Sequence, residues 1–97
     1  MTLRRRYLIT YDIADDGRRG RVFDACRQQG DHTQYSVFVA DLTDRELVAF
    51  QMNIEALIHR DHDQVLIADL GPVGRASGGI IASLGRPYEP PTRAIVV

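Results

Sequence analysis

Three aspartates follow the first hydrophobic segment of the chain, at Asp12, Asp15 and Asp16. Residues 6–13 alternate in polarity, which predicts a strand that ends at or just after Asp12. A carboxylate at a strand end is held by a rigid element and stays open to solvent, so Asp12 could bind a hard cation. A polar residue that only faces a loop is the alternative, and spacing alone leaves both open. Asp15 and Asp16 are better explained as capping residues of a following helix.

The other candidate motifs have simpler explanations. Residues 59–63 (HRDHD) include ligand types for zinc or nickel, but the two histidines straddle an expected helix end, so a polar loop is predicted. The glycine-rich stretch 71–79 lacks the lysine of a P-loop and the spacing of a dinucleotide site. Cys26 is the only cysteine; its apolar helical position predicts a small core residue, and no nucleophilic triad is evident.

The charged residues are distributed unevenly along the chain. All 12 basic residues are arginines, and the formal net charge is −1. Residues 1–30 are rich in arginine, whereas acids dominate residues 31–70. A near-neutral total therefore still allows an electropositive face. Guanidinium groups bind phosphate oxygens in a bidentate manner, which makes nucleic acid a candidate partner; a balanced, solvated surface would explain the same charges.

The elements that would position these residues follow from periodicity. A first helix of about 13 residues should begin after the capping aspartates and end before Gly30 as its C′ residue. Thr43 and Glu46 match a capping box, which predicts a second helix to about residue 59. Strands are predicted, besides the first, at about 31–34, 34–41, 64–70, 80–84 and 94–97.

This order of elements predicts an α+β fold, a ferredoxin-like βαββαβ sandwich with an extra C-terminal strand. The 97 residues should form one domain, 1–97, in which about 85–97 are an extended tail with a final strand. Apolar side chains beyond those that two helices can bury, namely Tyr7, Ile9, Val37 and Val39, favour a homodimer. No apolar run approaches a membrane span and no leader is evident, so we expect a cytoplasmic protein with no membrane partner.

Together these segments resemble a known family. The run Tyr11-Asp12-Ile13 with arginines after it, followed by residues 34–38 (QYSVF), is similar to the small CRISPR-associated ferredoxin-like proteins, the second core protein of that system. Members accompany the spacer integrase and are described as metal-dependent endonucleases. Residues 84–87 (LGRP) and 94–97 (AIVV) match the last strand and tail of the family. The resemblance covers essentially all 97 residues.

The resemblance assigns roles to particular residues. It implies that Asp12 is the metal-binding and catalytic aspartate, with Mg²⁺ or Mn²⁺ as the cofactor. It links arginines of the first helix to nucleic-acid binding. It places three further residues in the motif of the family and in the interface. The arginines linked to nucleic-acid binding are Arg18, Arg19 and Arg21. The motif and interface residues are Tyr11, Ser36 and Phe38.

Three functions remain open at this point. The chain could be a scaffold that binds duplex DNA with the integrase, or a nuclease acting on duplex DNA or single-stranded RNA. It could also be a ferredoxin-like regulatory or interaction module for a small ligand, without nuclease activity, although the arginine-rich first helix argues against this. One aspartate per chain with no evident general base makes a slow hydrolase, which favours the scaffold.

Overall fold

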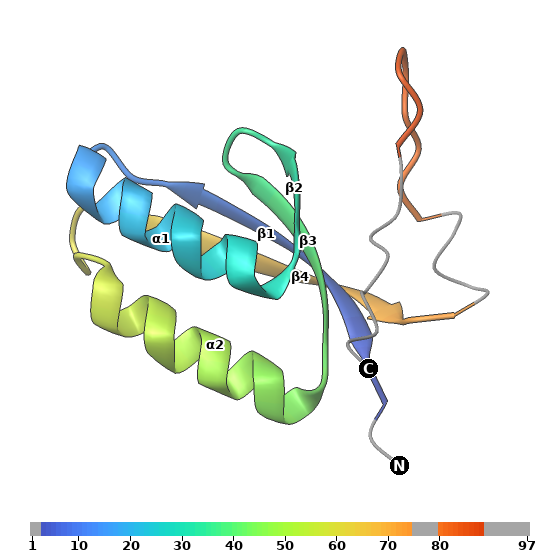
Figure 1. Cartoon of the computed structure of the whole chain (residues 1–97), viewed down its shortest axis with the longest axis horizontal. Coiled ribbons are helices and arrows are strands. Elements are labelled where there is room, and N and C mark those ends of the chain that lie inside the picture. The colour runs from blue at the N-terminus through green and yellow to red at the C-terminus, as the bar shows by residue number, and fades with distance from the viewer. Residues whose placement is uncertain (1–2, 75–79, 89–97) are drawn as a thin grey trace.

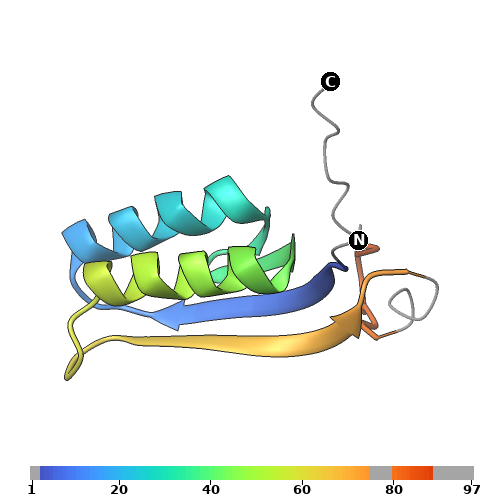
Figure 2. The same cartoon turned by 90° about the horizontal axis from the view of Figure 1, so that it is seen from below.

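The computed structural model describes residues 3–74 and 80–88. Within these described residues, two helices cover one face of a sheet, and no helix covers the other face (Figures 1 and 2). The strand order is β2-β3-β1-β4, and all neighbouring strands are antiparallel. This is the predicted ferredoxin-like arrangement. The elements are β1 (Arg5–Asp12), α1 (Asp16–Gln29), β2 (Asp31–Gln34), β3 (Val37–Leu42), α2 (Asp44–Leu57) and β4 (Gln64–Pro72).

The core lies between the helices and the sheet. Alternate residues of β1, namely Tyr7, Ile9 and Tyr11, are buried there. Phe38 of β3 is the largest fully buried side chain. The apolar stripe that predicted α2 joins the same cluster through Phe50 and Ile54, so the periodicity of both element types is satisfied by one core.

Both helices begin at the capping residues that the sequence indicates. The Asp15 carboxylate accepts a hydrogen bond from the Arg18 backbone N–H at 2.8 Å, and this bond lowers the pKa of Asp15. At α2 the predicted capping box is present: Thr43 Oγ1 accepts from Glu46 N at 3.1 Å, and Glu46 Oε1 accepts from Thr43 N at 2.9 Å. Each cap satisfies backbone donors that a helix start leaves unpaired.

Gly30 caps α1, but for a different reason from the one expected. A C′ glycine normally supplies a left-handed backbone, whereas Gly30 has φ −158° and ψ −173°, which any residue adopts. What requires glycine is space. A Cβ at this position would lie 2.4 Å from the Val39 carbonyl oxygen and 2.7 Å from the Ala40 Cβ. The end of α1 thus packs directly against the backbone of β3.

The open face of the sheet carries two of the four apolar residues predicted for it, Val37 and Val39. Tyr7 and Ile9 lie in the helix-facing core, so their assignment to the uncovered face was wrong. Instead, Leu8 of β1 pairs with Val39 on one side and Ala68 on the other. Two further apolar residues lie on the same face, and both pair with Thr10. Leu66 of β4 is 55% exposed, and Val37 of β3 is partly exposed.

A buried ion pair lies toward one end of this open face. Arg6 binds Asp41 through two parallel contacts of 2.8 and 3.0 Å, and both side chains are 8% exposed. Tyr88 lies near enough for both charges to act on its hydroxyl, and burial raises the pKa of Tyr88. That hydroxyl is buried and has no hydrogen-bond partner among the described residues. Residues 80–88 therefore reach the sheet through Tyr88.

The strand predicted at 80–84 is not formed. Residues 80–88 run as bends, and Ser83 Oγ accepts a hydrogen bond from the Tyr88 backbone N–H at 3.3 Å. The segment is rich in strand-forming residues, but no described strand pairs with it, and a strand needs such a partner. The strand predicted at 94–97 lies outside the described residues. β4 extends two residues past the predicted end, to Pro72.

An ion pair between distant parts of the chain joins the start of α1 to the turn before β4. Arg18 Nε donates to Asp63 Oδ2 at 2.7 Å, and its terminal nitrogen donates to Oδ1 at 3.2 Å. The Asp63 side chain is fully covered, and it also accepts from the His59 backbone N–H at 2.8 Å. The hydrogen bonds from Arg18 are the main cause of the lowered pKa of Asp63.

We predict opposite effects for two glycine substitutions in or beside α1. Gly30→Ala should lower the free energy of unfolding by roughly 1–3 kcal/mol, because its methyl group would overlap the β3 backbone. Gly20→Ala is the matched control: nothing lies within 4 Å of its added Cβ, so a helix-interior alanine should stabilise by about 0.5–1 kcal/mol. Urea denaturation of the two variants measures both values. An equal gain from both would contradict the close approach at Gly30.

We also predict an acid-dependent loss of stability through Asp63. The carboxyl is bound as the anion in the folded state, so its folded pKa lies below its unfolded pKa of about 4. Its contribution is complete above the unfolded pKa and is lost as the pH falls through the folded pKa. Asp63→Asn should therefore reduce stability at neutral pH and flatten the decline below about pH 4. Asp61→Asn, at an exposed position in the same turn, should leave the pH profile unchanged.

Candidate active site

Asp12 is the last residue of β1, where it pairs in register with Gln64 of β4. Its side chain is exposed, on the open face of the sheet, because it alternates with the buried Tyr11 and Ile13. No hydrogen bond or ion pair joins the carboxylate to any residue in the described ranges. A charged group on a rigid strand is therefore available to an external ligand.

The loop after Asp12 is held by the first turn of α1. Arg19 donates from one terminal nitrogen to the carbonyl oxygens of Ile13, at 3.0 Å, and Ala14, at 3.1 Å. Its other terminal nitrogen binds Asp16. These bonds fix the backbone that leads away from Asp12.

Tyr11, which precedes Asp12, contacts the other two motif residues, Ser36 and Phe38. The Tyr11 ring packs on Phe38, with ring centroids 6.3 Å apart. The Tyr11 backbone N–H donates to the Ser36 carbonyl oxygen at 3.2 Å. Burial raises the pKa of Tyr11. Tyr11 and Phe38 are core residues and Ser36 is partly buried, so within one chain they position Asp12.

The arginines of α1 differ in how freely they can bind an anion. Arg18 is engaged by Asp63, and Arg19 by Asp16 and two carbonyl oxygens. Arg21 is exposed and forms no hydrogen bond or ion pair with another residue of the described ranges. Of the three predicted nucleic-acid ligands, Arg21 thus offers the whole of its guanidinium group.

The donor set near Asp12 fits a hard cation only in part. Mg²⁺ accepts one or two carboxylates and keeps several waters, and the exposed Asp12 carboxylate suits that role. Within residues 3–74 and 80–88, however, no group of three or more His, Cys, Asp or Glu could hold a metal ion. Within the described residues, one chain therefore supplies the single carboxylate of Asp12 at this strand end.

The histidine-rich turn and the cysteine have structural roles. His59 Nδ1 accepts a hydrogen bond from the Asp61 backbone N–H at 3.2 Å, and the ring centroids of His59 and His62 lie 4.2 Å apart. Asp63 is occupied by Arg18. Cys26 is completely buried, and burial raises its pKa to about 12, which confirms the prediction of an unreactive core residue.

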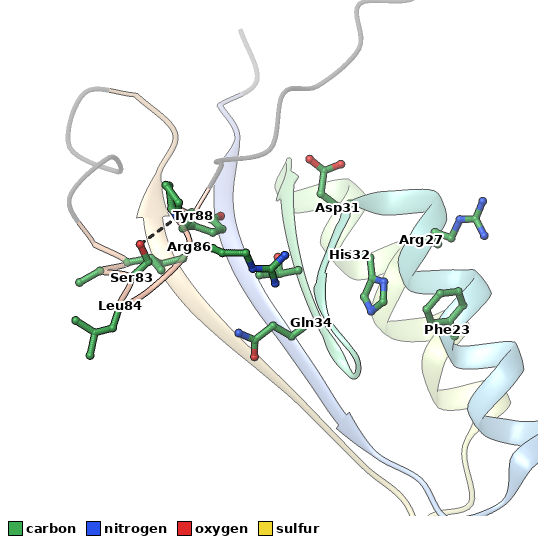
Figure 3. Close-up of a pocket in the computed structure, with 14 residues that line it drawn as sticks. Phe23, Arg27, Asp31, His32, Gln34, Ser83, Leu84, Arg86 and Tyr88 are labelled. Carbon is green, nitrogen blue, oxygen red and sulfur yellow. Dashed lines mark hydrogen bonds between the residues drawn. The ribbon is translucent and has the colours of Figure 1, made fainter.

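A cleft of about 1290 Å³ opens between β2 and residues 80–88 (Figure 3). Sequence analysis did not find it. In Figure 3 the Arg86 side chain extends from residues 80–88 toward β2, on the side of Gln34. The composition did indicate a basic segment here, since residues 80–88 contain one arginine and no acid. What the sequence does not disclose is that this segment lies beside β2.

Comparison with known proteins agrees with this geometry. A family model described as CRISPR associated protein Cas2 matches residues 5–74. A protein of Thermodesulfovibrio yellowstonii named CRISPR-associated endoribonuclease Cas2 is 41% identical over 83 residues, which are 86% of each chain. One from Geobacter sulfurreducens with the same designation is 30% identical over 91 residues, covering 94% of this chain and 95% of its own length.

Solved structures give the same answer. A hypothetical protein of Thermus thermophilus superposes with a TM-score of 0.73 at 30% identity, over 90% of this chain and 98% of the other. Cas2 of Streptococcus pyogenes superposes with a TM-score of 0.69 over 82% and 99%, and its 24% identity supports the fold alone. No helix in the described part of the chain has the length and apolar character to cross a membrane. With the family model matched from β1 to the end of β4, the chain belongs to the Cas2 family of CRISPR-associated proteins.

Proposed function

We propose that this chain is a subunit of CRISPR spacer acquisition that works as a homodimer, binds the backbone of nucleic acid and hydrolyses it slowly through Asp12. The observation that supports this most directly is the exposed Asp12 carboxylate at the end of the central strand, free of partners within the described residues. Relatives with the name CRISPR-associated endoribonuclease support a phosphodiester substrate. The compartment that fits this role is the cytoplasm.

The homodimer is supported by the open sheet face. Leu8, Val37 and Leu66 lie on this face, and Leu66 is exposed to 55%. Burial of such a surface against a second copy removes apolar area from water. A two-fold axis near the end of β1 would also bring two Asp12 carboxylates together, and each chain would then contribute one ligand to a shared metal.

Mg²⁺ or Mn²⁺, when bound, would neutralise charge on the phosphoryl oxygens and supply an activated water. The residues of the chain have simpler tasks. Asp12 holds the cation, Tyr11 and Ser36 fix the strand that carries Asp12, and Arg19 fixes the loop beyond it. No histidine or acid within the described ranges hydrogen bonds to Asp12 to act as a base, so hydrolysis should be slow.

A scaffold role in the same complex is the second candidate. Arg21 is free to contact phosphate oxygens, and Arg18 and Arg19 keep their positive charge near the same helix start. Contacts of this type bind duplex DNA without regard to base sequence and weaken as salt rises. The spacer integrase is the protein partner that this role requires. The slow chemistry expected of a single carboxylate per chain favours this scaffold role over rapid turnover.

We predict that Asp12→Asn abolishes Mg²⁺-dependent cleavage, because the amide keeps the shape and removes the charge that holds the cation. Cleavage of labelled single-stranded RNA and duplex DNA, with and without EDTA, measures the effect. Asp24→Asn is the matched control, since Asp24 is an exposed acid on α1 outside the proposed site. Its cleavage should equal that of the unmodified protein.

Two results of this experiment decide between the candidates. Cleavage by Asp12→Asn at the unmodified rate would show that Asp12 is not catalytic. Spacer acquisition in cells that survives the substitution, together with loss of cleavage in vitro, would assign the scaffold role to this chain.

We predict that Leu66→Asp converts the dimer to monomer, because a charge would be buried within the open face when two copies associate. Sedimentation at micromolar concentration measures the association. Met52→Asp is the control: Met52 is 68% exposed on α2, on the helix layer away from this face, so its variant should remain dimeric. If Leu66→Asp stays dimeric while folded, the open face is not the interface.

A further inference from the structure

Tyr35 is an aromatic residue placed almost entirely in solvent. It lies in the turn between β2 and β3, and 93% of its surface is exposed. Exposure of a whole tyrosine gains nothing for the fold, since large aromatic side chains stabilise proteins by burial. The ring is therefore not explained by packing within the chain.

The position of Tyr35 brings it close to the candidate active site. Its neighbour Ser36 accepts a backbone hydrogen bond from Tyr11 at 3.2 Å, and Tyr11 directly precedes Asp12. The turn is also held from the other side. His32 Nε2 donates to the Tyr35 carbonyl oxygen at 2.7 Å, and the His32 ring stacks on Phe38 with centroids 4.8 Å apart. An exposed ring thus stands on a fixed backbone next to Asp12.

The edge of β2 continues from this turn into the cleft shown in Figure 3. All four residues of β2 are exposed, and β2 is one of the two edge strands of the described sheet. Arg86 faces the edge from residues 80–88 and forms no ion pair with a residue of the described ranges. Arg27 lies at the rim of the cleft with its side chain directed outward, and Asp31 is the one acid among the lining residues.

We propose that a single strand of nucleic acid binds along this edge, with a base stacked on Tyr35 and a phosphate bound by Arg86 in the cleft. The proposal rests on the proposed function, since it describes how a substrate strand reaches Asp12. Tyr35 and Arg86 act as positioning residues. They hold the strand along the edge of β2 that leads toward Asp12, and they do not take part in bond cleavage.

The chemistry favours a single strand over a duplex or a protein segment. A base can stack on a tyrosine only when its face is uncovered, and in a duplex both faces are covered by neighbouring bases. Stacking is tolerant of sequence, which suits a protein without base-reading residues at this site. An apolar peptide strand would pair with the edge of β2 but would provide no negative charge to bind Arg86.

The test is binding in EDTA, where no metal-dependent cleavage occurs. Fluorescence anisotropy would measure the affinity for a labelled oligouridine of about a dozen nucleotides and for a duplex of the same length. Tyr35→Ala should weaken binding of the single strand by about five- to a hundredfold and change duplex binding by less than about twofold. Tyr35→Phe keeps the ring and should restore single-strand binding.

Arg86→Ala should weaken the same single strand and reduce the salt dependence of its binding by about one phosphate contact. Arg60→Ala is the matched control, because Arg60 is an exposed arginine in the turn before β4, far along the chain from the cleft residues. It should leave single-strand affinity within about twofold of the unmodified protein. Equal losses from both variants would show that only total charge matters, and would overturn the proposal.

Four other results would also overturn it. Tyr35→Ala could leave single-strand affinity unchanged, or it could weaken single strand and duplex alike. It could convert the dimer to monomer in sedimentation, in which case Tyr35 is a dimer contact. A synthetic peptide of residues 89–97 that binds the cleft when the oligouridine does not would assign the cleft to protein. Failure of cleavage in the Asp12 experiment would leave this binding test unaffected.

Discussion

Strand β1 is hydrogen-bonded on both sides, to β3 and to β4, and its register with both neighbours determines what each face of the sheet carries. Tyr7, Ile9 and Tyr11 point into the helix-facing core, so the residues between them are committed to the other face. A shift by one residue would exchange the two sets. It would expose three large apolar side chains and bury Asp12. The cost of that exchange keeps the carboxylate in solvent.

The fold was largely predictable because its strongest signals are local. The capping box at Thr43 involves residues three apart, and the alternation in residues 6–13 fixes a strand without reference to the rest of the chain. Alternation does not say which of two apolar faces the helices will cover, and for this reason Tyr7 and Ile9 were assigned to the wrong side. The segment at 80–84 has strand-forming residues but no strand beside it, which its sequence cannot reveal.

The candidate site was predictable only at its centre. Asp12 was identifiable from its position at a strand end, and its exposure agrees. Which arginines are engaged in ion pairs could not be predicted, because ion pairs form between residues that are distant in the sequence. Arg18 is bound by Asp63, which lies 45 positions along the chain, whereas Arg21 has no such partner in the described ranges. An arginine-rich helix in a sequence therefore overstates the charge that is free to bind phosphate. The cleft beside β2 could not be predicted either, because it forms between segments that are distant in the sequence.

The pairing of Asp12 with Gln64 also bears on how the protein folds. The hairpin of β2 and β3 joins residues close in the chain and can form early, whereas β1 meets β4 only by closing a loop that contains both helices. The strand end that holds Asp12 is consequently among the last parts to acquire its neighbours during synthesis. A nascent chain that has not yet produced β4 lacks the neighbour with which Asp12 pairs, so the strand end that carries the aspartate is open on that side. Under the function proposed above, the site around Asp12 would therefore be completed only when the whole domain has been made.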